Sequence, residues 1–332
     1  LITFHLAQID PTVGAVYENA EKILRYYEEA TGTGSDCVIF PELAIVGYPP
    51  QDLLLLDHFI DENRNALEWL AERVHSVPAV VGFVDREENH LFSAAAVLRD
   101  GEIRSVVHKR LLPTYDVFDE DRYFAEGGAS TTVTIQVKDA RVQLGLHVCE
   151  DLWDTVHDLK VVDDLAADGA DVFINLSASP FYSAKWKERV DLARKKSEAF
   201  GVPFLYCNMV GAQDELVFDG NSFAIDAEGN LTHRAPAFEE SLFPVVLDLD
   251  NGYQTETVIH DISREEEIFR ALRYGLREYC DKSGFTSVVL GMSGGIDSSL
   301  VALIAAEALG PDNVLGVSMP SHYSSDHSKS DA

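Results

Sequence analysis

The sequence predicts an α/β protein in two parts of unequal size, and three patterns lead to this prediction. Up to about residue 250, apolar strands alternate with amphipathic helices. Residues 251–262 show neither the two-residue period of a strand nor the 3.6-residue period of a helix, and they are typical of a linker. A helix, a short apolar strand and a second apolar helix then follow. We therefore expect an α/β domain over 1–250, a linker over 251–262, and the start of a second α/β domain over 263–332.

The elements of the first domain follow from its hydrophobic periods. Alternation with period two or short apolar runs predict strands, and a 3.6-residue period predicts helices. Turn residues such as Asp100-Gly101 and Gly229-Asn230 predict two hairpins. On these grounds we expect helices over 16–30 and 184–200, strands over 1–9, 37–43, 77–85, 140–153, 171–179, 202–211 and 243–250, and hairpins over 91–109 and 217–235.

The second part begins with a helix whose ends are marked. Ser263 precedes an apolar repeat at helical spacing, and Glu266 follows three residues later, which is the pattern of a capping box. Gly284 is placed to end this helix. A strand over 288–290 and an apolar helix over 300–309 come next.

Composition excludes several classes of protein. The 332 residues include 26 Lys and Arg against 56 Asp and Glu, a formal net charge of -30. This acidity argues against binding nucleic acid or an anionic membrane through a general basic field. Four widely spaced cysteines form no CxxC pair, so we expect neither zinc nor disulfides, and reduced thiols indicate the cytoplasm. We expect no secretory signal and no membrane-spanning helix, because no apolar run is long enough.

A glycine-rich loop between the strand and the apolar helix of the second part predicts a phosphate site. Its glycines permit tight turns, and its backbone N–H groups and serine hydroxyls can surround phosphate oxygens at a helix N-terminus. It contains no lysine, so it differs from the GxxxxGK[ST] loop. The predicted ATP-binding residues are Gly291, Met292, Ser293, Gly294, Gly295, Ile296, Asp297, Ser298 and Ser299.

Three polar residues of the first domain stand at predicted strand ends, where a side chain can be held rigidly. Glu42 lies in "FPEL", Lys109 in "HKRLLP" and Cys149 in "CEDLW". A thiol becomes a strong nucleophile once deprotonated, a carboxylate can take its proton, and an ammonium can lower the thiol pKa and stabilise an oxyanion. Each residue alone also fits an ordinary structural role. Cys37, Cys207 and Cys280 lie on apolar strand or helix faces, and we expect them to be inert.

These motifs resemble two known families. "FPEL", "HKRLLP" and "CEDLW" resemble the nitrilase superfamily of carbon–nitrogen hydrolases, over almost all of residues 1–250. That resemblance implies an αββα sandwich with Glu42, Lys109 and Cys149 as catalytic residues. "SGGIDSS" resembles the loop of the ATP pyrophosphatases, which implies a Rossmann-like parallel sheet with Asp297 helping to bind Mg²⁺. By the same resemblance, the second domain is incomplete at residue 332.

Taken together, the two parts resemble the glutamine-dependent NAD⁺ synthetases. "LPTYDVFDEDRYF", "NLSASPFYSAKWKER" and "CNMVGAQDELVFDGNSF" carry this more specific likeness. It implies that glutamine is hydrolysed in the first domain. It further implies that ammonia passes through an internal tunnel to amidate ATP-adenylated deamido-NAD, giving NAD⁺, AMP, pyrophosphate and glutamate. Glutamine, ATP and deamido-NAD would be the substrates, Mg²⁺ the metal, with no prosthetic group, and the protein a homo-oligomer.

The same resemblance implies that Tyr115, Ser179 and Lys185 contact glutamine, although Lys185 fits a solvated helix face equally well. Two other functions stay open. One is a stand-alone amidase of the nitrilase superfamily with a vestigial nucleotide loop. The other is a non-catalytic subunit that binds nucleotide without turnover.

Overall fold

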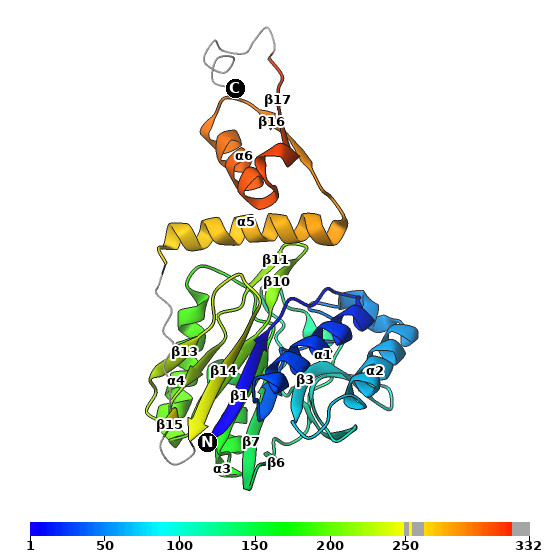
Figure 1. The fold of residues 1–332 in the computed structure, drawn as a ribbon, viewed down its shortest axis with the longest axis vertical. Coiled ribbons are helices and arrows are strands. Elements are labelled where there is room, and N and C mark those ends of the chain that lie inside the picture. The colour runs from blue at the N-terminus through cyan, green and yellow to red at the C-terminus, as the bar shows by residue number, and fades with distance from the viewer. Residues whose placement is uncertain (249–251, 254–261, 321–332) are drawn as a thin grey trace. The chain divides into compact units, whose positions relative to one another are not determined.

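The computed structural model describes residues 1–248, 252–253 and 262–320 (Figure 1). It divides into two compact units. The larger unit contains the strands and helices up to residue 248, apart from Gly211–Val217, which group with the second unit. Most of the predicted linker over 251–262 lies outside the described residues, and the domain boundaries stay a prediction. Of these residues the structure describes Gly252–Tyr253, which form a short strand, and Ile262.

A mixed seven-stranded sheet forms one layer of the larger unit. Its strands are β1 (Ile2–Gln8), β2 (Cys37–Ile39), β3 (Ala79–Glu87), β4 (His90–Arg99), β5 (Glu102–His108), β14 (Ser241–Asp248) and β15 (Gly252–Tyr253). Their order across the sheet is β15-β14-β1-β2-β3-β4-β5. β2 pairs in parallel with β1 and β3, and the other ladders are antiparallel.

A six-stranded sheet forms the second layer. Its strands are β6 (Val133–Val137), β7 (Ala140–Val148), β8 (Val172–Ser177), β9 (Phe204–Asn208), β12 (Phe223–Ile225) and β13 (Leu231–Arg234). They lie in the order β13-β12-β9-β8-β7-β6, with β7, β8 and β9 parallel. β10 (Val210–Gln213) and β11 (Leu216–Asp219) form a separate two-stranded sheet.

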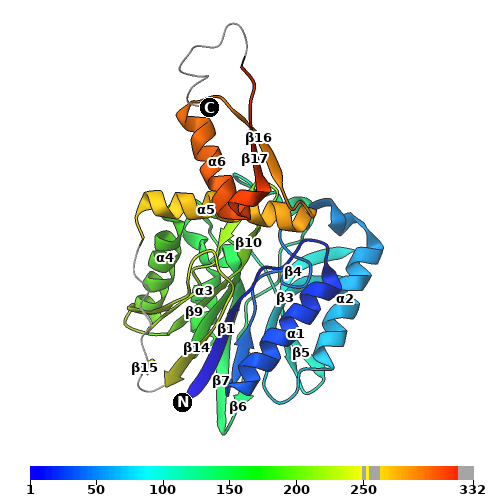
Figure 2. The same ribbon diagram turned by 45° about the horizontal axis from the view of Figure 1, so that its top comes forward.

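Helices cover the outer faces of both sheets (Figures 1 and 2). They are α1 (Val16–Gly32), α2 (Asp57–Ala71), α3 (Val161–Ala167) and α4 (Lys185–Phe200). α2 packs on β3 and β5 and against α1, whereas α3 contacts β7 and α4 contacts β9 and β12. This arrangement confirms the expected αββα sandwich. No helix of the described residues is both long and apolar enough to cross a membrane.

The core lies between the two sheets, and strand alternation explains its composition. Because successive side chains of a strand point to opposite faces, every second residue of β1 and β8 enters the same layer. Phe173 points the other way and packs with α3 and α4. The buried inter-sheet residues include Ile2, Phe4 and Leu6 of β1, Leu144, Leu146 and Val148 of β7, and Val172, Ile174 and Leu176 of β8.

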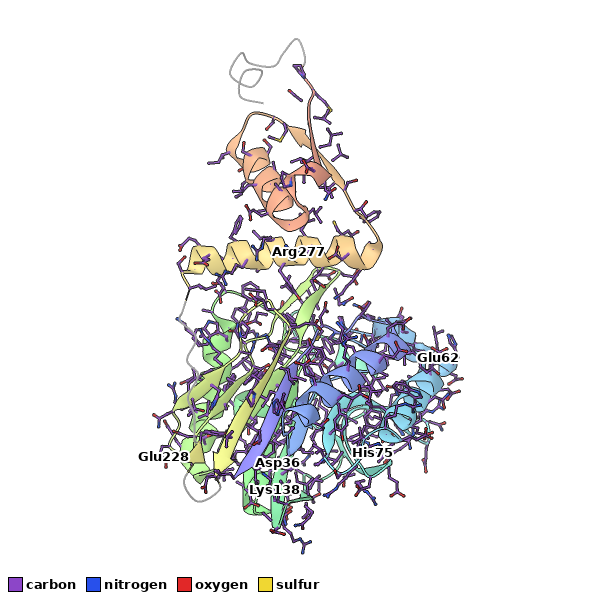
Figure 3. The ribbon with its side chains drawn as sticks, in the orientation of Figure 1. Asp36, Glu62, His75, Lys138, Glu228 and Arg277 are labelled. Atoms are coloured by element: carbon purple, nitrogen blue, oxygen red, sulfur yellow. The ribbon has the colours of Figure 1, made fainter. Side chains whose placement is uncertain are left out.

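An ion pair joins the two sheets at one end. Lys138, in the turn between β6 and β7, lies near Asp36, which precedes β2 (Figure 3), and its Nζ is 2.7 Å from Asp36 Oδ2. Asp36 Oδ2 also accepts a hydrogen bond of 2.9 Å from the Thr3 backbone N–H. The Lys138 side chain is 59% exposed, so the pair stabilises the fold little. The two sheets are held together chiefly by the apolar layer.

The second unit contains α5 (Arg264–Ser283), β16 (Val288–Met292), α6 (Ile296–Leu309) and β17 (Val314–Ser318). The Glu266 N–H donates to Ser263 Oγ at 3.1 Å, and Gly284 ends α5 with φ 72°, as the sequence predicted. β16 and β17 pair in parallel. The expected helix over 300–309 begins earlier, at Ile296, because residues of the glycine loop form its first turn.

Short 3-10 helices complete the described elements, and three of them border polar residues discussed below. They are η1 (Gln51–Leu55), η2 (Glu120–Arg122), η3 (Cys149–Leu152), η4 (Asp154–Val156) and η5 (Pro311–Asn313).

Candidate active site

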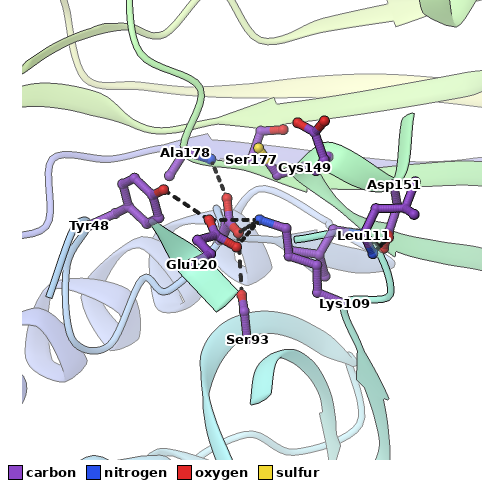
Figure 4. A network of polar contacts seen from close by, with 12 residues as sticks. Tyr48, Ser93, Lys109, Leu111, Glu120, Cys149, Asp151, Ser177 and Ala178 are labelled. Atoms are coloured by element: carbon purple, nitrogen blue, oxygen red, sulfur yellow. Dashed lines mark hydrogen bonds and ion pairs between the residues drawn. The ribbon is translucent and has the colours of Figure 1, made fainter. Parts of the chain in front are cut away.

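Lys109 lies at the centre of a buried polar cluster (Figure 4). It directly follows β5, and its Nζ lies 2.8 Å from Glu42 Oε1 and 2.9 Å from Glu120 Oε1. Burial acts to lower the pKa of Lys109, but the charges of Glu120 and Glu42 outweigh it and hold this pKa well above its usual value. Lys109 is therefore a fixed cation between two carboxyl groups.

Glu42 is held by groups from both sheets. Its Oε1 accepts a 3.3 Å hydrogen bond from Ser93 Oγ on β4, and its Oε2 accepts one of 2.9 Å from the Ala178 N–H after β8. The backbone around Glu42 passes very close to Gly82 of β3, and only a glycine leaves room for it. A Cβ at that position would lie only 2.2 Å from the Pro41 carbonyl oxygen. The carboxylate is therefore oriented before any substrate arrives.

Cys149 lies where β7 ends and η3 begins. Its φ of 43° is in the left-handed region, which costs a residue with a Cβ roughly 1–3 kcal/mol. Figure 4 shows Cys149 near Ser177 at the edge of the Lys109 cluster. Only 5% of the residue is exposed. Such a sharp turn at a strand end holds the thiol rigidly in place.

The expectation that Lys109 makes Cys149 a thiolate is wrong for this structure. Burial raises the pKa of the Cys149 thiol, the Glu42 carboxylate raises it further, and the opposing effect of Lys109 is too small to compensate. Cys149 is therefore a neutral thiol at rest. A base must take its proton during attack rather than before it.

Two members of this cluster, Glu120 and Tyr48, were not predicted from the sequence. Tyr48 donates its hydroxyl proton to Glu120 Oε1 at 2.9 Å, and Lys109 contacts the same carboxyl group. Burial raises the pKa of Glu120 to about 7, although the charge of Lys109 opposes this shift. The signal was weak, since Glu120 is one of four acidic residues in "DVFDED" and only burial distinguishes it.

Two of the predicted glutamine-binding residues, Tyr115 and Lys185, border the same phenylalanine. The Tyr115 ring meets that of Phe118 edge to face, with centroids 5.5 Å apart. The ammonium of Lys185 lies 5.9 Å from the Phe118 ring, 5.7 Å from that of Trp153 and 4.9 Å from that of Tyr182. Burial, and then the charge of Arg189, lowers the pKa of Lys185. Lys185 is thus held among aromatic rings and is not a freely solvated lysine.

Tyr115 also contacts an acid beside the cysteine. Its hydroxyl lies 2.9 Å and 3.1 Å from the two carboxylate oxygens of Glu150. Glu150 directly follows Cys149 and is buried, and sequence analysis did not single it out. A carboxylate and an ammonium thus border the region of Cys149, with opposite charges that suit the two ends of an amino acid.

Ser179, the third predicted glutamine contact, is buried. Its N–H donates to Asn208 Oδ1 at 2.9 Å, and its carbonyl accepts from Arg189 Nη2 at 3.3 Å. Arg189 is fully buried and also pairs with Asp219 Oδ1 at 2.7 Å. Ser179 is therefore fixed by its backbone, two residues beyond the end of β8.

The predicted phosphate loop is exposed at the N-terminus of α6. Ser293 Oγ lies 3.1 Å from Ser298 Oγ, and both Ser298 and Ser299 donate hydroxyl protons to the Gly295 carbonyl. Gly294 has φ 76°, a conformation that glycine adopts without strain. Asp297 lies in the first turn of the helix. The Asp297 carboxylate is an oxygen ligand of the kind that Mg²⁺ prefers, whereas backbone N–H groups and serine hydroxyls at the start of α6 can donate hydrogen bonds to phosphate oxygens.

Comparisons with known proteins agree with this geometry. Residues 6–257 match the carbon-nitrogen hydrolase family, and residues 268–332 match the NAD synthase family. The chain belongs to the carbon-nitrogen hydrolase family, whose model covers most of its length. A solved amidase from Nesterenkonia sp. AN1 shares the fold, with a TM-score of 0.62 and 22% identity over 76% of this chain and 96% of that one.

Longer relatives match nearly the whole chain. Glutamine-dependent NAD(+) synthetases from Synechocystis sp. and Thermotoga maritima are 42% and 41% identical over 100% and 98% of it. The solved glutamine-dependent NAD⁺ synthetase from Acinetobacter baumannii, in complex with ADP, has a TM-score of 0.92 and 33% identity over 99% of this chain and 61% of that one. The chain spans 62% of the length of each of those two curated relatives.

Proposed function

We propose that this chain forms the glutaminase and the beginning of the synthetase of a glutamine-dependent NAD⁺ synthetase. The proposal rests on one observation: Lys109 is buried between Glu42 and Glu120 beside Cys149. The same chain also contains the predicted phosphate loop over residues 291–299. The 42% identity to the Synechocystis enzyme over the whole chain supports the same function.

Glutamine hydrolysis would proceed through a thioester on Cys149. As the thiol proton moves to Glu42, Sγ bonds to the side-chain amide carbon, and the carbonyl electron pair moves onto oxygen next to Lys109. The carbonyl then re-forms, the C–N bond breaks, and Glu42 returns the proton to nitrogen, which releases ammonia. Water next gives a proton to Glu42 while its oxygen bonds to the thioester carbon. Cleavage of the C–S bond then releases glutamate, and the sulfur regains its proton.

Glutamine itself would be recognised by the charges that border Cys149. Lys185 faces the α-carboxylate in this proposal, and Glu150, held by Tyr115, faces the α-ammonium. Ser179 contributes through its fixed backbone. A simple aliphatic amide has neither charge, so the stand-alone amidase should not need this pair.

The second site would use ATP to activate the carboxylate of deamido-NAD. The carboxylate oxygen bonds to the α-phosphorus of ATP and pyrophosphate leaves, held by the loop over residues 291–299. Ammonia then attacks the acyl carbon and displaces AMP, which gives NAD⁺. Mg²⁺, when bound, would neutralise charge on the phosphates, and Asp297 would be one of its ligands.

Assaying glutamate release from glutamine, with acetamide as the alternative substrate, tests the proposal directly. We expect glutamine to be hydrolysed and acetamide to be a poor substrate. Hydrolysis of acetamide with a comparable kcat/KM would favour the stand-alone amidase. Binding of ATP with no hydrolysis of either amide would favour the non-catalytic subunit.

The Asp297→Ala variant should separate the two sites. In the complete enzyme, we expect synthesis of NAD⁺ from ammonium to fall by at least roughly tenfold, because Mg²⁺–ATP loses a ligand. Glutamine hydrolysis, measured as glutamate released, should stay within a few-fold of the unchanged protein. Asp312→Ala removes another exposed acid of the same unit and serves as the control. An equal loss of NAD⁺ synthesis in Asp297→Ala and Asp312→Ala would argue against Asp297 as a ligand of Mg²⁺.

The homo-oligomeric state stays a prediction. The resemblance to nitrilase-family domains, which usually associate through their sheet-bearing faces, leads us to expect that the purified full-length protein scatters light as a multiple of its chain mass. A mass equal to one chain across the whole concentration range would contradict it.

A further inference from the structure

We propose that Asp151 is a positioning residue that fixes the position of Lys109 relative to Cys149 for the reaction. This inference rests on the proposed glutaminase function. Asp151 lies in η3, two residues after Cys149, and is almost completely buried. Neither its spacing nor its charge marked it in the sequence.

Three backbone N–H groups donate to this one carboxylate. Its Oδ1 accepts from the Arg110 N–H at 3.0 Å and from the Leu111 N–H at 2.9 Å, and its Oδ2 accepts from the Val148 N–H at 3.0 Å. Figure 4 shows Asp151 beside Leu111, next to the catalytic cluster.

The donors come from the two loops that carry the chemistry. Arg110 and Leu111 directly follow Lys109, after β5 of the seven-stranded sheet. Val148 directly precedes Cys149, at the end of β7 of the six-stranded sheet. Asp151 thus joins the backbone next to Lys109, the cation proposed to stabilise the oxyanion, to the backbone next to Cys149, the proposed nucleophile. A displacement of about 1 Å between such groups can cost roughly 10²-fold in rate.

Only an ionised carboxylate fits all three donors. Burial raises the pKa of Asp151 to about 6, and the N–H groups of Val148 and Leu111 oppose that rise. The group is therefore charged at neutral pH. An asparagine would place its NH₂ group against either the Val148 N–H or the N–H groups of Arg110 and Leu111. A donor would then face a donor, and the hydrogen bonds on that side of the side chain would be lost.

A purely structural role makes a different prediction. If Asp151 only stabilised the turn, its loss would lower the melting temperature but leave the turnover number of the folded protein unchanged. If it sets the distance between Lys109 and Cys149, kcat falls while the KM for glutamine stays near its original value. The contacts proposed for glutamine, at Glu150 and Lys185, do not involve Asp151.

The test compares Asp151→Asn with Asp154→Asn in the full-length protein. Asp154 is also buried and lies in the next 3-10 turn, but its carboxylate pairs with Lys196 of α4 at 2.7 Å rather than with the backbone next to Lys109 or Cys149. We measure kcat and KM for glutamine with ATP and deamido-NAD present, the melting temperature, and the rate at which iodoacetamide alkylates Cys149, followed by mass spectrometry.

We expect Asp151→Asn to lower kcat by at least roughly tenfold and to slow alkylation of Cys149, with KM changed less than threefold. Asp154→Asn should lower only the melting temperature. If Asp151→Asn does not fold, Asp151→Glu keeps both acceptor oxygens but shifts them by one methylene, and should show the same loss of kcat. A folded variant at Asp151 with unchanged kcat and alkylation would overturn the inference.

The alkylation measurement also separates this inference from the proposed function. If the unchanged protein releases no glutamate, the glutaminase proposal fails. The rate of Cys149 alkylation in the two variants still shows whether Asp151 positions the thiol. An alkylation rate that is equal in all three proteins would reject the positioning role by itself.

Discussion

Replacing Cys149 by alanine is expected to abolish glutamine hydrolysis and, in the complete enzyme of the proposed function, to spare NAD⁺ synthesis from added ammonium. Without Sγ no thioester forms, and no other thiol is available, because Cys37, Cys207 and Cys280 are buried elsewhere. Alanine keeps the Cβ, so the strained φ of 43° is not made worse. Removing one buried sulfur leaves a small cavity and should cost about 1 kcal/mol of unfolding free energy.

The measurements are glutamate release, NAD⁺ formation from glutamine, and NAD⁺ formation from ammonium. Cys37→Ala is the matched control, since it removes a fully buried thiol from the inter-sheet core. It should keep all three activities. Glutamate release by Cys149→Ala would end the assignment of the nucleophile. Equal loss of the glutamine and ammonium routes would argue against two separate sites.

Replacing Lys109 by glutamine should have the next largest effect, on both catalysis and stability. The oxyanion loses its cation, so kcat for glutamine hydrolysis should fall by roughly 10²–10³-fold. Glu42 and Glu120 also lose the ammonium that both contact within 3 Å. Breaking a buried ion pair on one side costs about 3–5 kcal/mol, because the remaining charge has no partner.

Urea unfolding and steady-state kinetics measure these two effects. Lys195→Gln is the control, because Lys195 is 65% exposed and pairs with Asp191 on the surface of α4. Its effect on both measurements should be close to zero. If Lys109→Gln matched this control in stability, the buried cluster would not be ionised as described. A retained kcat would remove Lys109 from the oxyanion role.

Much of the fold follows from local pattern. The two periods of the first domain predicted most of its strands and the helices α1 and α4, but not α2, α3 or β6. The family resemblance implied the αββα sandwich that the structure shows. Errors came where local signals were weak. The helix expected at 300 begins at Ile296, since the polar residues of the glycine loop do not show the apolar period although they are helical.

The candidate site was predicted in part. Glu42, Lys109 and Cys149 stood out because each ends an apolar strand in a family-like motif, and the structure brings Glu42 and Lys109 to 2.8 Å. Glu120 and Asp151 did not stand out, since an acid in an acidic protein carries no signal until its burial is known. Cys149, in contrast, was identified from its motif, but its raised pKa could not be predicted, because that pKa depends on burial that the motif does not reveal.

The sequence by itself determined most of the strands, the helices α1, α4 and α5, the chemical type of the three predicted catalytic residues, and the glycine loop, because these depend on neighbouring residues. The tertiary structure alone decided which charges meet. Lys109 and Glu42 are 67 positions apart and become partners only when β4, β5 and the loop after β2 pack together. Whether a thiol is ionised or an aspartate joins two loops depends on distance and on exclusion of water. Both are properties of packing between elements distant in the chain.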